Sequence, residues 1–420
     1  MSEAHRSSEM RDAVCPACSC LCDDIEMGRD PSGEPVFKHV CGKGRSFFTA
    51  ASGDSPAVYY VGSDSVTMAV AVQAAADLLK QAQMPLVTGL SGVGMECQQV
   101  ALQLARRISG VVDIDGNPDR SRQFAFQRTG GVTATLGEVR NRVDKILFWC
   151  FDPTESHPRL LERCSVESKK IIVVGPADWT SGRADHFVEL DPEFSDHAIA
   201  TCHAVGCNLA LDPGVVVETT GVPLSQWNEL IEVLGQQDSV ACFVGESGQS
   251  GSSLQTFYDR MAQWAGQMNS KIRFFCLFPH QLANRLAAED VLAMNTGFPS
   301  AVNLSRQQPE FSFLEYATQT LLERQETDVI MLLSSAGLDQ LNQAARGQLN
   351  QVPKILLLNG REFESLGELE LNEGDVRVEM PTIAQGDWAR MDNVLLPVRN
   401  GTDTESEVTC GFLEALLNQV

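Results

Sequence analysis

Short apolar runs recur along the chain, and each ends in a turn residue before a segment with helical spacing begins. A run that is apolar on both faces is typical of a strand in a parallel sheet that helices cover on both sides. The runs occupy residues 85–94, 145–153, 170–176, 240–246, 328–335 and 354–360. This pattern predicts an α/β fold with parallel sheets, and residues 393–398 predict a last strand near the end of the chain.

Two helices are predicted where apolar residues recur at every fourth position, because that spacing places them on one helix face. The positions are Val100, Leu104 and Ile108 for the helix after residues 85–94, and Val66, Val70 and Ala74 for the helix before them.

The loops that follow the strands are the places to look for chemistry, because ligands bind at the carboxyl ends of parallel strands. The glycine loop at 89–94 brings backbone amides near a phosphate if it is a binding loop, but such a loop is more often a plain strand-to-helix turn. Asp152, His157 and Arg159 follow another strand and form a candidate polar cluster. His157 fits equally well as a hydrogen-bonded loop residue.

Charge and targeting signals exclude some classes of partner. The 420 residues include 32 Lys and Arg and 55 Asp and Glu, a formal net charge of −23. Nucleic-acid phosphates and anionic membranes repel such a surface, so we expect neither as a partner. Residues 1–12 lack the apolar core of a signal peptide, and no apolar stretch approaches the roughly 20 residues that span a bilayer. Thirteen cysteines without a paired framework suit a reducing compartment, so we expect a cytoplasmic protein.

Four cysteines near the N-terminus carry the strongest chemical signal. Cys15, Cys18, Cys22 and Cys41 form the pattern C-x2-C-x3-C-x18-C. Thiolates hold iron–sulfur clusters and zinc, and short spacings let one turn present several sulfurs to one centre. The asymmetric spacing favours a [4Fe–4S] cluster, whereas a zinc site usually has a second C-x2-C pair, which is missing here. Disulfides are a third interpretation, and Cys20 is a spare thiol or an alternate ligand.

Four segments together resemble the B subunit of formylmethanofuran dehydrogenase, a member of the molybdopterin oxidoreductase superfamily. The first is Cys-Pro-Ala-Cys-Ser-Cys-Leu-Cys-Asp-Asp-Ile-Glu at 15–26, followed by Cys41. The others lie at 136–144, 149–159 and 380–397, occur in the family's order and span nearly the whole chain. The Cys-Asp-Asp-Ile motif with the His-Pro-Arg loop is specific to this family within the superfamily.

The resemblance implies a fold with a small Cys-rich lobe on two Rossmann-like α/β domains. We expect the lobe at 1–55, a discontinuous first α/β domain at 56–115 plus about 290–420, and a second at 116–289. The family binds a [4Fe–4S] cluster through the cysteines matched by Cys15, Cys18, Cys22 and Cys41, and Lys43 stands where a basic residue is usual. The family also binds tungsten or molybdenum on two pterin dinucleotides, where carbon dioxide is reduced to formate.

This sequence departs from the family at the metal ligand and at the residues that hold the dinucleotide. The family's metal takes a Cys or selenocysteine ligand from the loop after the strand matched by 111–114, but no cysteine lies between Cys97 and Cys150. Where the family carries Asp-Pro-Arg to hold a dinucleotide, this chain has Gly-Pro-Ala at 175–177. We therefore expect the tungsten or molybdenum bis-pterin dinucleotide to be lost, and we assign the chain no catalytic residue.

A non-redox relative of this protein exists in the formyltransferase/hydrolase complex of tetrahydromethanopterin-dependent formaldehyde oxidation. There a formyl group passes to a methanofuran-type carrier and is hydrolysed to formate. The resemblance implies that an amidohydrolase-like A subunit and a formyltransferase D subunit do the chemistry, with a C subunit alongside. On this interpretation the chain is a scaffold whose partners are the A, C and D subunits.

Two alternatives remain open at this point. The first is an active tungsten or molybdenum formylmethanofuran dehydrogenase subunit, in which Ser121 replaces the missing cysteine as the metal ligand. The second is an iron–sulfur protein that uses its cluster for electron transfer or sensing.

Overall fold

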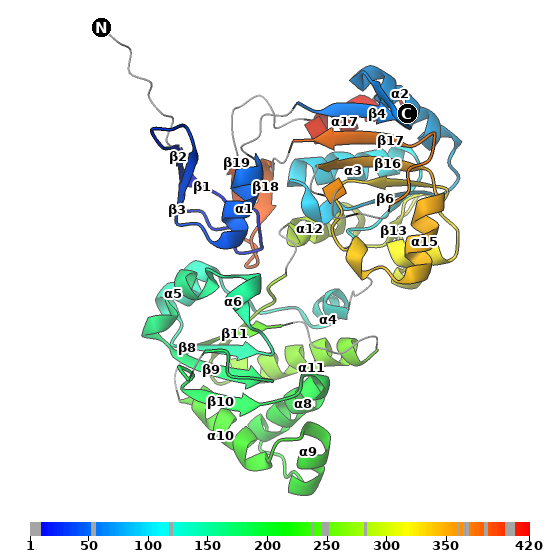
Figure 1. The fold of residues 1–420 in the computed structure, drawn as a ribbon. Coiled ribbons are helices and arrows are strands. Elements are labelled where there is room, and N and C mark those ends of the chain that lie inside the picture. Colours follow the sequence, from blue (N-terminus) through cyan, green and yellow to red (C-terminus); the bar gives the residue numbers. More distant parts are fainter. Residues whose placement is uncertain are drawn as a thin grey trace. The chain divides into compact units, whose positions relative to one another are not determined.

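The computed structural model describes residues 10–51, 56–116, 121–180, 182–236, 239–245, 252–280, 284–359, 362–363, 366, 369–381, 385–399 and 408–420. The chain divides into two compact units, each with a large sheet of its own (Figure 1). Unit 1 comprises Met1–Pro118 and Leu282–Val420, and unit 2 comprises Asp119–Gln281. No helix in the described part of the chain is long and apolar enough to cross a membrane.

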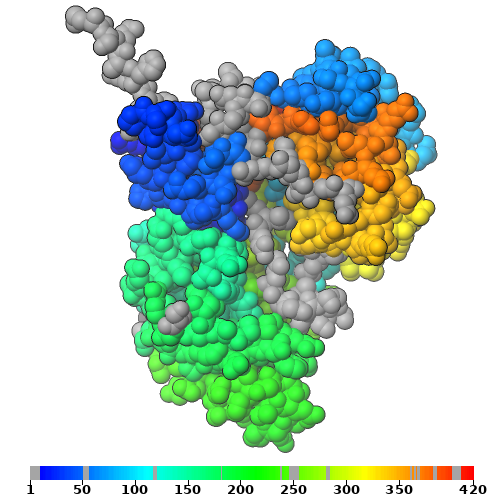
Figure 2. Space-filling view, in the orientation of Figure 1, coloured from blue at the N-terminus to red at the C-terminus, as the bar shows by residue number. Residues whose placement is uncertain are grey.

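Unit 1 contains a nine-stranded sheet with the order β14-β13-β7-β6-β15-β16-β17-β4-β5. Its strands are β4 (Val58–Val61), β5 (Asp64–Val66), β6 (Pro85–Thr88), β7 (Val111–Val112), β13 (Val302–Asn303), β14 (Glu310–Phe311), β15 (Val329–Leu332), β16 (Lys354–Asn359) and β17 (Val376–Met380). The five central strands run parallel, whereas the strands at both edges pair antiparallel. Figure 2 shows the blue segment that contains β4 beside the orange strand β17, with which β4 pairs.

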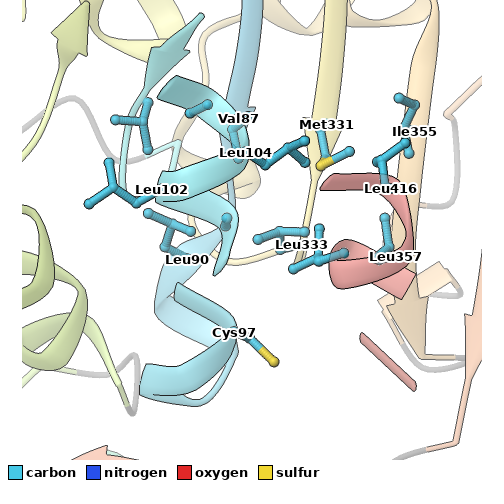
Figure 3. Close-up of a cluster of buried hydrophobic side chains, with 14 of the residues drawn as sticks. Val87, Leu90, Cys97, Leu102, Leu104, Met331, Leu333, Ile355, Leu357 and Leu416 are labelled. Atoms are coloured by element: carbon cyan, nitrogen blue, oxygen red, sulfur yellow. The ribbon is translucent and has the colours of Figure 1, made fainter. Parts of the chain in front are cut away.

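Helices cover both faces of this sheet. They are α2 (Met68–Gln81), α3 (Met95–Arg107), α12 (Arg285–Thr296), α13 (Phe313–Tyr316), α14 (Thr318–Glu323), α15 (Gln343–Gln351) and α17 (Val408–Leu417), with short 3-10 turns η1 (Leu90–Gly92) and η4 (Leu338–Gln340). Met331 and Leu357 pack with Leu416 of α17 on one face (Figure 3), and Ile330 and Leu356 join the core on the other. Alternate strand residues point to opposite faces, so these strands are apolar throughout.

The helix before β6 differs from its prediction in the face that it buries. Thr67 caps α2, because its hydroxyl accepts the N–H of Val70 at 3.4 Å, so Val66 belongs to β5. Val70 is 51% exposed, and the predicted face of Val66, Val70 and Ala74 is therefore wrong. The buried residues are Ala71, Val72, Ala75, Ala76 and Leu79. Alanine carries a weak hydrophobic signal, so a face built mostly of alanine does not stand out in the sequence.

The N-terminal segment of unit 1 forms a small lobe with its own sheet. The lobe consists of β1 (Met10–Ala13), β2 (Ile25–Arg29), β3 (Pro35–Lys38) and α1 (Gly42–Ala51), with the three strands in antiparallel order. A hairpin from the end of the chain, β18 (Gln385–Ala389) and β19 (Leu395–Arg399), packs against it. Val14 and Leu21 of the lobe share a core with Trp388 and Val398 of the hairpin.

Unit 2 is a five-stranded, fully parallel sheet with the order β10-β9-β8-β11-β12. Its strands are β8 (Lys145–Trp149), β9 (Lys170–Gly175), β10 (His186–Glu189), β11 (Ser239–Val244) and β12 (Arg273–Leu277). Its helices are α4 (Ser121–Thr129), α5 (Leu136–Arg142), α6 (Pro153–Ser156), α7 (Leu160–Arg163), α8 (Ser195–Gly206), α9 (Pro213–Thr220), α10 (Leu224–Gly235) and α11 (Ser252–Asn269), with 3-10 turns η2 (Val166–Ser168) and η3 (Pro192–Phe194). Trp149 packs with Trp227 of α10 and Trp264 of α11 on one face of the sheet.

The α/β fold predicted from the hydrophobic pattern is confirmed, and β6, β8, β9, β11, β15 and β16 lie in the predicted runs. The predicted helix after β6 is α3, and the predicted last strand is β19. The predicted parallel sheets are found in unit 2 and in the five central strands of unit 1, whose edge strands add antiparallel pairs that the sequence pattern did not indicate. Edge strands face solvent or a loop on one side, so they are shorter and less apolar than the central strands, and the sequence pattern did not separate them from loops.

Candidate functional site

The cysteine segment is a tight loop between β1 and β2. The N–H of Cys15 donates to the carbonyl of Cys22 at 2.8 Å, and the N–H of Leu21 donates to the carbonyl of Cys18 at 3.2 Å. These bonds fold the loop back on itself and bury its thiols, whereas Cys41, just before α1, is half-buried.

Three of the predicted ligand cysteines lie in this loop, and the fourth, Cys41, is near enough just before α1 for its charge to act on Cys15. The pKa of Cys15 is raised, mainly by burial and further by the negative charge that Cys22, Cys18 and Cys41 carry when ionised. A Cβ on Gly44 would lie only 2.9 Å from the Sγ of Cys15 and 3.9 Å from that of Cys41, so a glycine is needed at this position of α1. The Gly44 N–H also donates to the Cys41 Sγ at 3.5 Å.

Cys18 is more easily ionised than Cys15. Its pKa is lowered to about 7, chiefly by a hydrogen bond from the Cys20 side chain, with the positive charge of Lys43 as a smaller cause. Burial acts in the opposite direction. Because a thiolate is the form that binds metal, this environment suits a ligand. It also gives Cys20 a role as a hydrogen-bond donor to Cys18.

The spacing of these cysteines favours a multi-iron cluster over a single zinc ion, and this preference rests on the sequence. Zinc requires four sulfurs at about 2.3 Å from one point. Among the described residues, no three His, Cys, Asp or Glu side chains lie close enough together to hold one metal ion. The thiolates of a cluster bind different irons and stand further apart. The assignment of Cys15, Cys18, Cys22 and Cys41 as cluster ligands, with Lys43 nearby, stays a prediction.

The hairpin near the C-terminus holds the cysteine loop in place. Arg390 makes two hydrogen bonds to Asp392, at 2.8 and 2.9 Å, and its Nη1 lies 3.6 Å from the Oδ2 of Asp23. The N–H of Met391 donates to the carbonyl of Ser19 at 3.0 Å. Burial acts to lower the pKa of Arg390, but its bonds to Asp392 and the charges of Asp392 and Asp23 leave that pKa raised. Two motifs that lie far apart in the sequence, Cys-Asp-Asp and Asp-Trp-Ala-Arg-Met-Asp, therefore meet.

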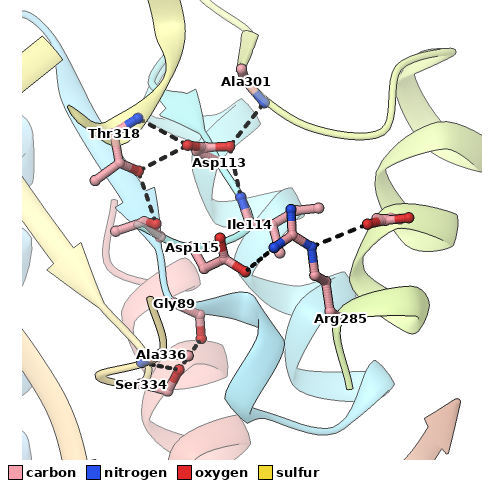
Figure 4. A network of polar contacts seen from close by, with 11 residues as sticks. Gly89, Asp113, Ile114, Asp115, Arg285, Ala301, Thr318, Ser334 and Ala336 are labelled. Atoms are coloured by element: carbon pink, nitrogen blue, oxygen red, sulfur yellow. Dashed lines mark hydrogen bonds and ion pairs between the residues drawn. The ribbon is translucent and has the colours of Figure 1, made fainter. Parts of the chain in front are cut away.

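A second polar site follows β7, where the related family carries its metal ligand. Asp113 is fully buried and accepts four hydrogen bonds at 2.9–3.2 Å, from the N–H groups of Ile114, Ala301 and Thr318 and from the Thr318 hydroxyl. Figure 4 shows Asp113 at the centre of these donors. A carboxylate with this many donors is fixed in place and serves to tie β7 to the segments before β13 and at the start of α14.

The next carboxylate in this loop is also held from within unit 1. Asp115 is fully buried, and its Oδ2 lies 3.6 Å from the Nη1 of Arg285 at the start of α12. Arg285 also bonds to Glu289 one turn later, at 3.2 Å. Figure 4 shows Arg285 reaching Asp115. Residues 117–120 of the loop lie outside the described residues, and Ser121 begins α4.

Close packing against Ser334 explains why glycines occupy the loop after β6. A Cβ on Gly89 would lie 2.5 Å from the backbone nitrogen of Ser334, and one on Gly92 would lie 2.3 Å from the Ser334 Cβ. At the start of α3, Glu96 accepts the N–H of Asp387 at 3.1 Å. A negative side chain thus already occupies the positive end of this helix.

The candidate polar cluster after β8 is not brought together around a ligand site. Asp152 caps α6 by accepting the N–H of Thr154 at 2.8 Å, and Arg159 pairs with Glu162. The His157 Nε2 lies 3.1 Å from the carbonyl oxygen of His280. Asp152 and Arg159 have local partners, whereas His157 contacts a carbonyl from a distant segment, as a hydrogen-bonded loop histidine would.

Sequence reasoning missed Asp113, Arg285 and Glu289. A signal was present, because two aspartates follow the apolar strand residues directly in Val-Val-Asp-Ile-Asp at 111–115. Arg285 and Glu289 stand four residues apart in a helix rich in apolar residues, the spacing of an ion pair on one face. Neither signal identifies its partner without the fold.

Comparison with known proteins shows that the chain is similar to formylmethanofuran dehydrogenase B subunits. The chain matches no protein-family model. It is 26% identical over 370 residues to the B subunit of tungsten-containing formylmethanofuran dehydrogenase 2 from Methanocaldococcus jannaschii, a match that covers 83% of this chain and 84% of that protein. The protein of the same name from Methanococcus maripaludis is 25% identical over 369 residues, with the same coverage.

Two solved structures share the fold. A chain of the formyltransferase/hydrolase complex FhcABCD from Methylorubrum extorquens, in complex with methylofuran, matches with a TM-score of 0.68 and 18% identity, covering 86% of this chain and 98% of that chain. Acetylene hydratase from Pelobacter acetylenicus matches with a TM-score of 0.63 and 12% identity, covering 98% of this chain and 69% of that chain. The resemblance seen in the sequence motifs is confirmed: the chain is a homologue of the B subunit of formylmethanofuran dehydrogenase, with the α/β fold of the molybdopterin oxidoreductases.

Proposed function

We propose that the chain is a non-redox scaffold subunit of a formyltransferase/hydrolase complex in tetrahydromethanopterin-linked oxidation of formaldehyde to formate. Its partners are the amidohydrolase-like A subunit, the formyltransferase D subunit and the C subunit of that complex. The chain itself supplies no catalytic residue.

The observation that carries this proposal is the state of the loop after β7. In the family this loop supplies the sulfur ligand of tungsten or molybdenum. Here its first residues are Asp113 and Asp115, and both carboxylates are buried and engaged by groups of unit 1. A carboxylate that already accepts several hydrogen bonds, or faces an arginine, has to lose those partners before it binds a metal.

The second observation that supports the proposal is the absence of the two side chains that hold the dinucleotide in the family. β9 ends at Gly175, and Gly175 and Ala177 stand where the family has a carboxylate and a guanidinium, on either side of the shared Pro176. A pterin dinucleotide is anionic, and removal of an arginine removes a bidentate partner for its phosphate. The match to a chain of FhcABCD covers 98% of that chain, so the two chains have a similar extent, as expected if this chain is the corresponding subunit.

The four cysteines are the cofactor site that we propose the chain retains. Cys15, Cys18, Cys22 and Cys41 would hold a [4Fe–4S] cluster, with Lys43 offsetting negative charge nearby. The cluster would supply one-electron chemistry when bound. Without a neighbouring pterin, the remaining role of these residues is to join the loop between β1 and β2 to the start of α1.

The second candidate function is an active tungsten-dependent formylmethanofuran dehydrogenase subunit. The names of the two curated relatives favour it, because both are tungsten-containing enzymes. It requires a ligand other than cysteine, and Ser121 is the residue that the sequence offers.

One experiment separates these functions. The tagged chain is purified gently and anaerobically from its own cells, and co-eluting proteins and bound metals are measured by mass spectrometry. We expect an amidohydrolase-like and a formyltransferase-like protein, with iron but without tungsten or molybdenum. Stoichiometric tungsten or molybdenum that disappears in Ser121→Ala overturns the scaffold proposal. Electron-carrier proteins and a reversible redox change at the iron centre favour the electron-transfer function instead.

A further inference from the structure

The part of unit 2 around its edge strand β10 carries an excess of negative charge. Residues 184–259 contain twelve Asp and Glu and no Lys or Arg, and they build β10, α8, α9 and α10. Arginines from outside the stretch pair with two of the twelve, Asp196 and Asp259. Within the described residues β10 pairs with β9 alone, so it forms one edge of the sheet (Figure 1). A surface of one sign attracts a partner of the opposite sign.

A pocket of about 330 Å³ lies at the carboxyl end of β10, wholly within unit 2. Its lining includes two carboxylates, those of Glu189 and Asp191, and the aromatic ring of Phe194. The rest of the lining comes from residues 220–223, between α9 and α10, and from Gln226 of α10. A pocket of this size accepts a single long side chain or a small ligand.

The two carboxylates of the pocket favour a cation as its occupant. Glu189 is exposed, and one oxygen of Asp191 accepts the N–H of Glu193 at 3.0 Å, which holds that carboxylate in place. Neither Glu189 nor Asp191 forms an ion pair with a Lys or Arg in the described part of the chain. Two carboxylates repel a phosphate-bearing ligand and form strong hydrogen bonds with an ammonium or guanidinium group.

Exposed apolar side chains lie on the elements that carry the pocket. Phe187 is 37% exposed, and it faces the same side of the sheet as Glu189, two residues later on β10. Val217 of α9 is 44% exposed, and its carbonyl accepts the N–H of Gly221, which lines the pocket. A free amine in the pocket would leave Phe187 and Val217 in water. A protein segment that carries a cation with apolar neighbours covers these side chains as well.

We propose that the β10 edge of unit 2 is the docking surface for a basic segment of a partner protein, with an arginine side chain of the partner in the pocket. The guanidinium pairs with Glu189 and Asp191 and stacks on the ring of Phe194, which a lysine does less well. Apolar residues beside that arginine cover Phe187 and Val217.

The identity of the partner as another subunit of the formyltransferase/hydrolase complex rests on the proposed function, whereas the docking surface does not. The binding measurements below use the chain without other subunits. They can therefore fail while the proposed function stands, and succeed where it fails.

The docking surface is tested on the purified full-length chain with a defined probe. The probe is a short fluorescein-labelled peptide in which arginine and valine alternate, and fluorescence anisotropy measures its Kd. Two matched peptides carry lysine or glutamate in place of arginine. We expect the arginine peptide to bind more tightly than the lysine peptide, and the glutamate peptide not to bind. A glutamate peptide that binds as tightly as the arginine peptide overturns the proposal.

Variants separate the pocket from the net charge of the chain. Glu189→Gln combined with Asp191→Asn should raise the Kd of the arginine peptide about tenfold. Glu315→Gln combined with Glu326→Gln removes the same charge from exposed positions of unit 1 and should change the Kd less than about twofold. Gln226→Arg places a cation of the chain itself at the pocket and should weaken binding about as much as the first pair. Equal weakening by the two double variants overturns the proposal.

Two further measurements test the occupant. Sedimentation of the chain alone should show no self-association that Glu189→Gln with Asp191→Asn abolishes, because such a result assigns the surface to a second copy of the chain. In the tagged purification, this double variant should lose a companion subunit that the control pair retains, with its iron content unchanged. Retention of every companion by the variant overturns docking of the complex at this surface.

Discussion

The cysteine loop and the loop after β7 are both places where the sequence resemblance implies a redox cofactor, yet their chemistry differs in this chain. In the cysteine loop, thiols converge on one another and a glycine leaves room beside them. After β7, the polar groups are two buried carboxylates that face donors from α12, from α14 and from the segment before β13. One loop gathers thiols, whereas the other uses its carboxylates to join segments of the protein.

Under the proposed function, this difference is that of a cofactor site that has changed into a structural one while the fold is kept. A buried carboxylate is stable only when donors or cations surround it. Once Asp113 and Asp115 have such partners, they bind the ends of several segments together and the sheet no longer depends on a cofactor there. The cysteine loop has no such replacement, because thiols make weak hydrogen bonds and stabilise a loop mainly through a metal.

The largest expected effect is on iron in the cysteine loop. We expect Cys41→Ser in anaerobically purified protein to lose essentially all of about four irons per chain, because a missing thiolate opens the cluster. Cys20→Ser is the matched control from the same loop and should keep its iron. Iron and acid-labile sulfide assays give the readout. A wild-type chain that contains no iron, or one zinc ion instead, would show that the cysteine loop holds no iron–sulfur cluster.

The next effect concerns the ion pairs after β7. Replacement of Arg285 by Met leaves the buried carboxylates of Asp115 and Glu289 without their cation, which costs about 3–5 kcal/mol of unfolding free energy. Chemical denaturation of the purified protein measures it. Lys38→Met breaks an exposed pair with Glu26 and should cost less than about 1 kcal/mol. Equal stability of Arg285→Met and the wild type would mean that this loop is not held by its charges.

A smaller effect is expected at the contact between the hairpin and the cysteine loop. Arg390→Gln removes the two bonds to the buried Asp392 and the attraction to Asp23, at a cost of roughly 2 kcal/mol. The cysteine loop should then open more often, and pulse alkylation should label Cys18 and Cys20 faster. Arg399→Gln, an exposed position on the same hairpin, is the control. Unchanged labelling in Arg390→Gln would show that the hairpin does not restrain the loop.

The smallest expected effect is a pH dependence of stability that comes from Glu362, just after β16 of the unit 1 sheet. The Glu362 carboxylate accepts the N–H groups of Ser335 and Asn359, and burial raises its pKa above the ordinary value of 4.5. The folded state therefore binds this proton more tightly than the unfolded state, so the stabilisation is complete below pH 4.5 and is lost as the pH rises through the folded pKa.

A glutamine side chain does not titrate, so the Glu362→Gln variant should not lose this stabilisation as the pH rises. The Tm of the wild type minus that of the variant should fall between about pH 4.5 and neutrality, as followed by thermal unfolding in matched buffers. If the Tm of the wild type and of the variant change in parallel with pH, or if their difference grows with pH, the pKa of Glu362 is not raised in the folded state.

The sequence by itself determined the parts of this protein that depend on local chemistry. Apolar runs such as 328–335 identified the central strands, because a strand buried on both faces has to be apolar at every position. The spacing of the cysteines and the Cys-Asp-Asp-Ile motif identified the relatives. The missing cysteine after β7 was also visible in the sequence, because an absent residue type needs no structure to be seen.

Only the tertiary structure decided which residues meet across the chain. Asp115 faces Arg285, and Arg390 reaches Asp23, over separations along the chain that no local pattern records. The buried face of α2 was likewise fixed by packing, because a face rich in alanine becomes apparent only against the sheet that it covers. Local patterns set the elements, whereas the partners of buried charges follow from which strand ends the fold places at one edge.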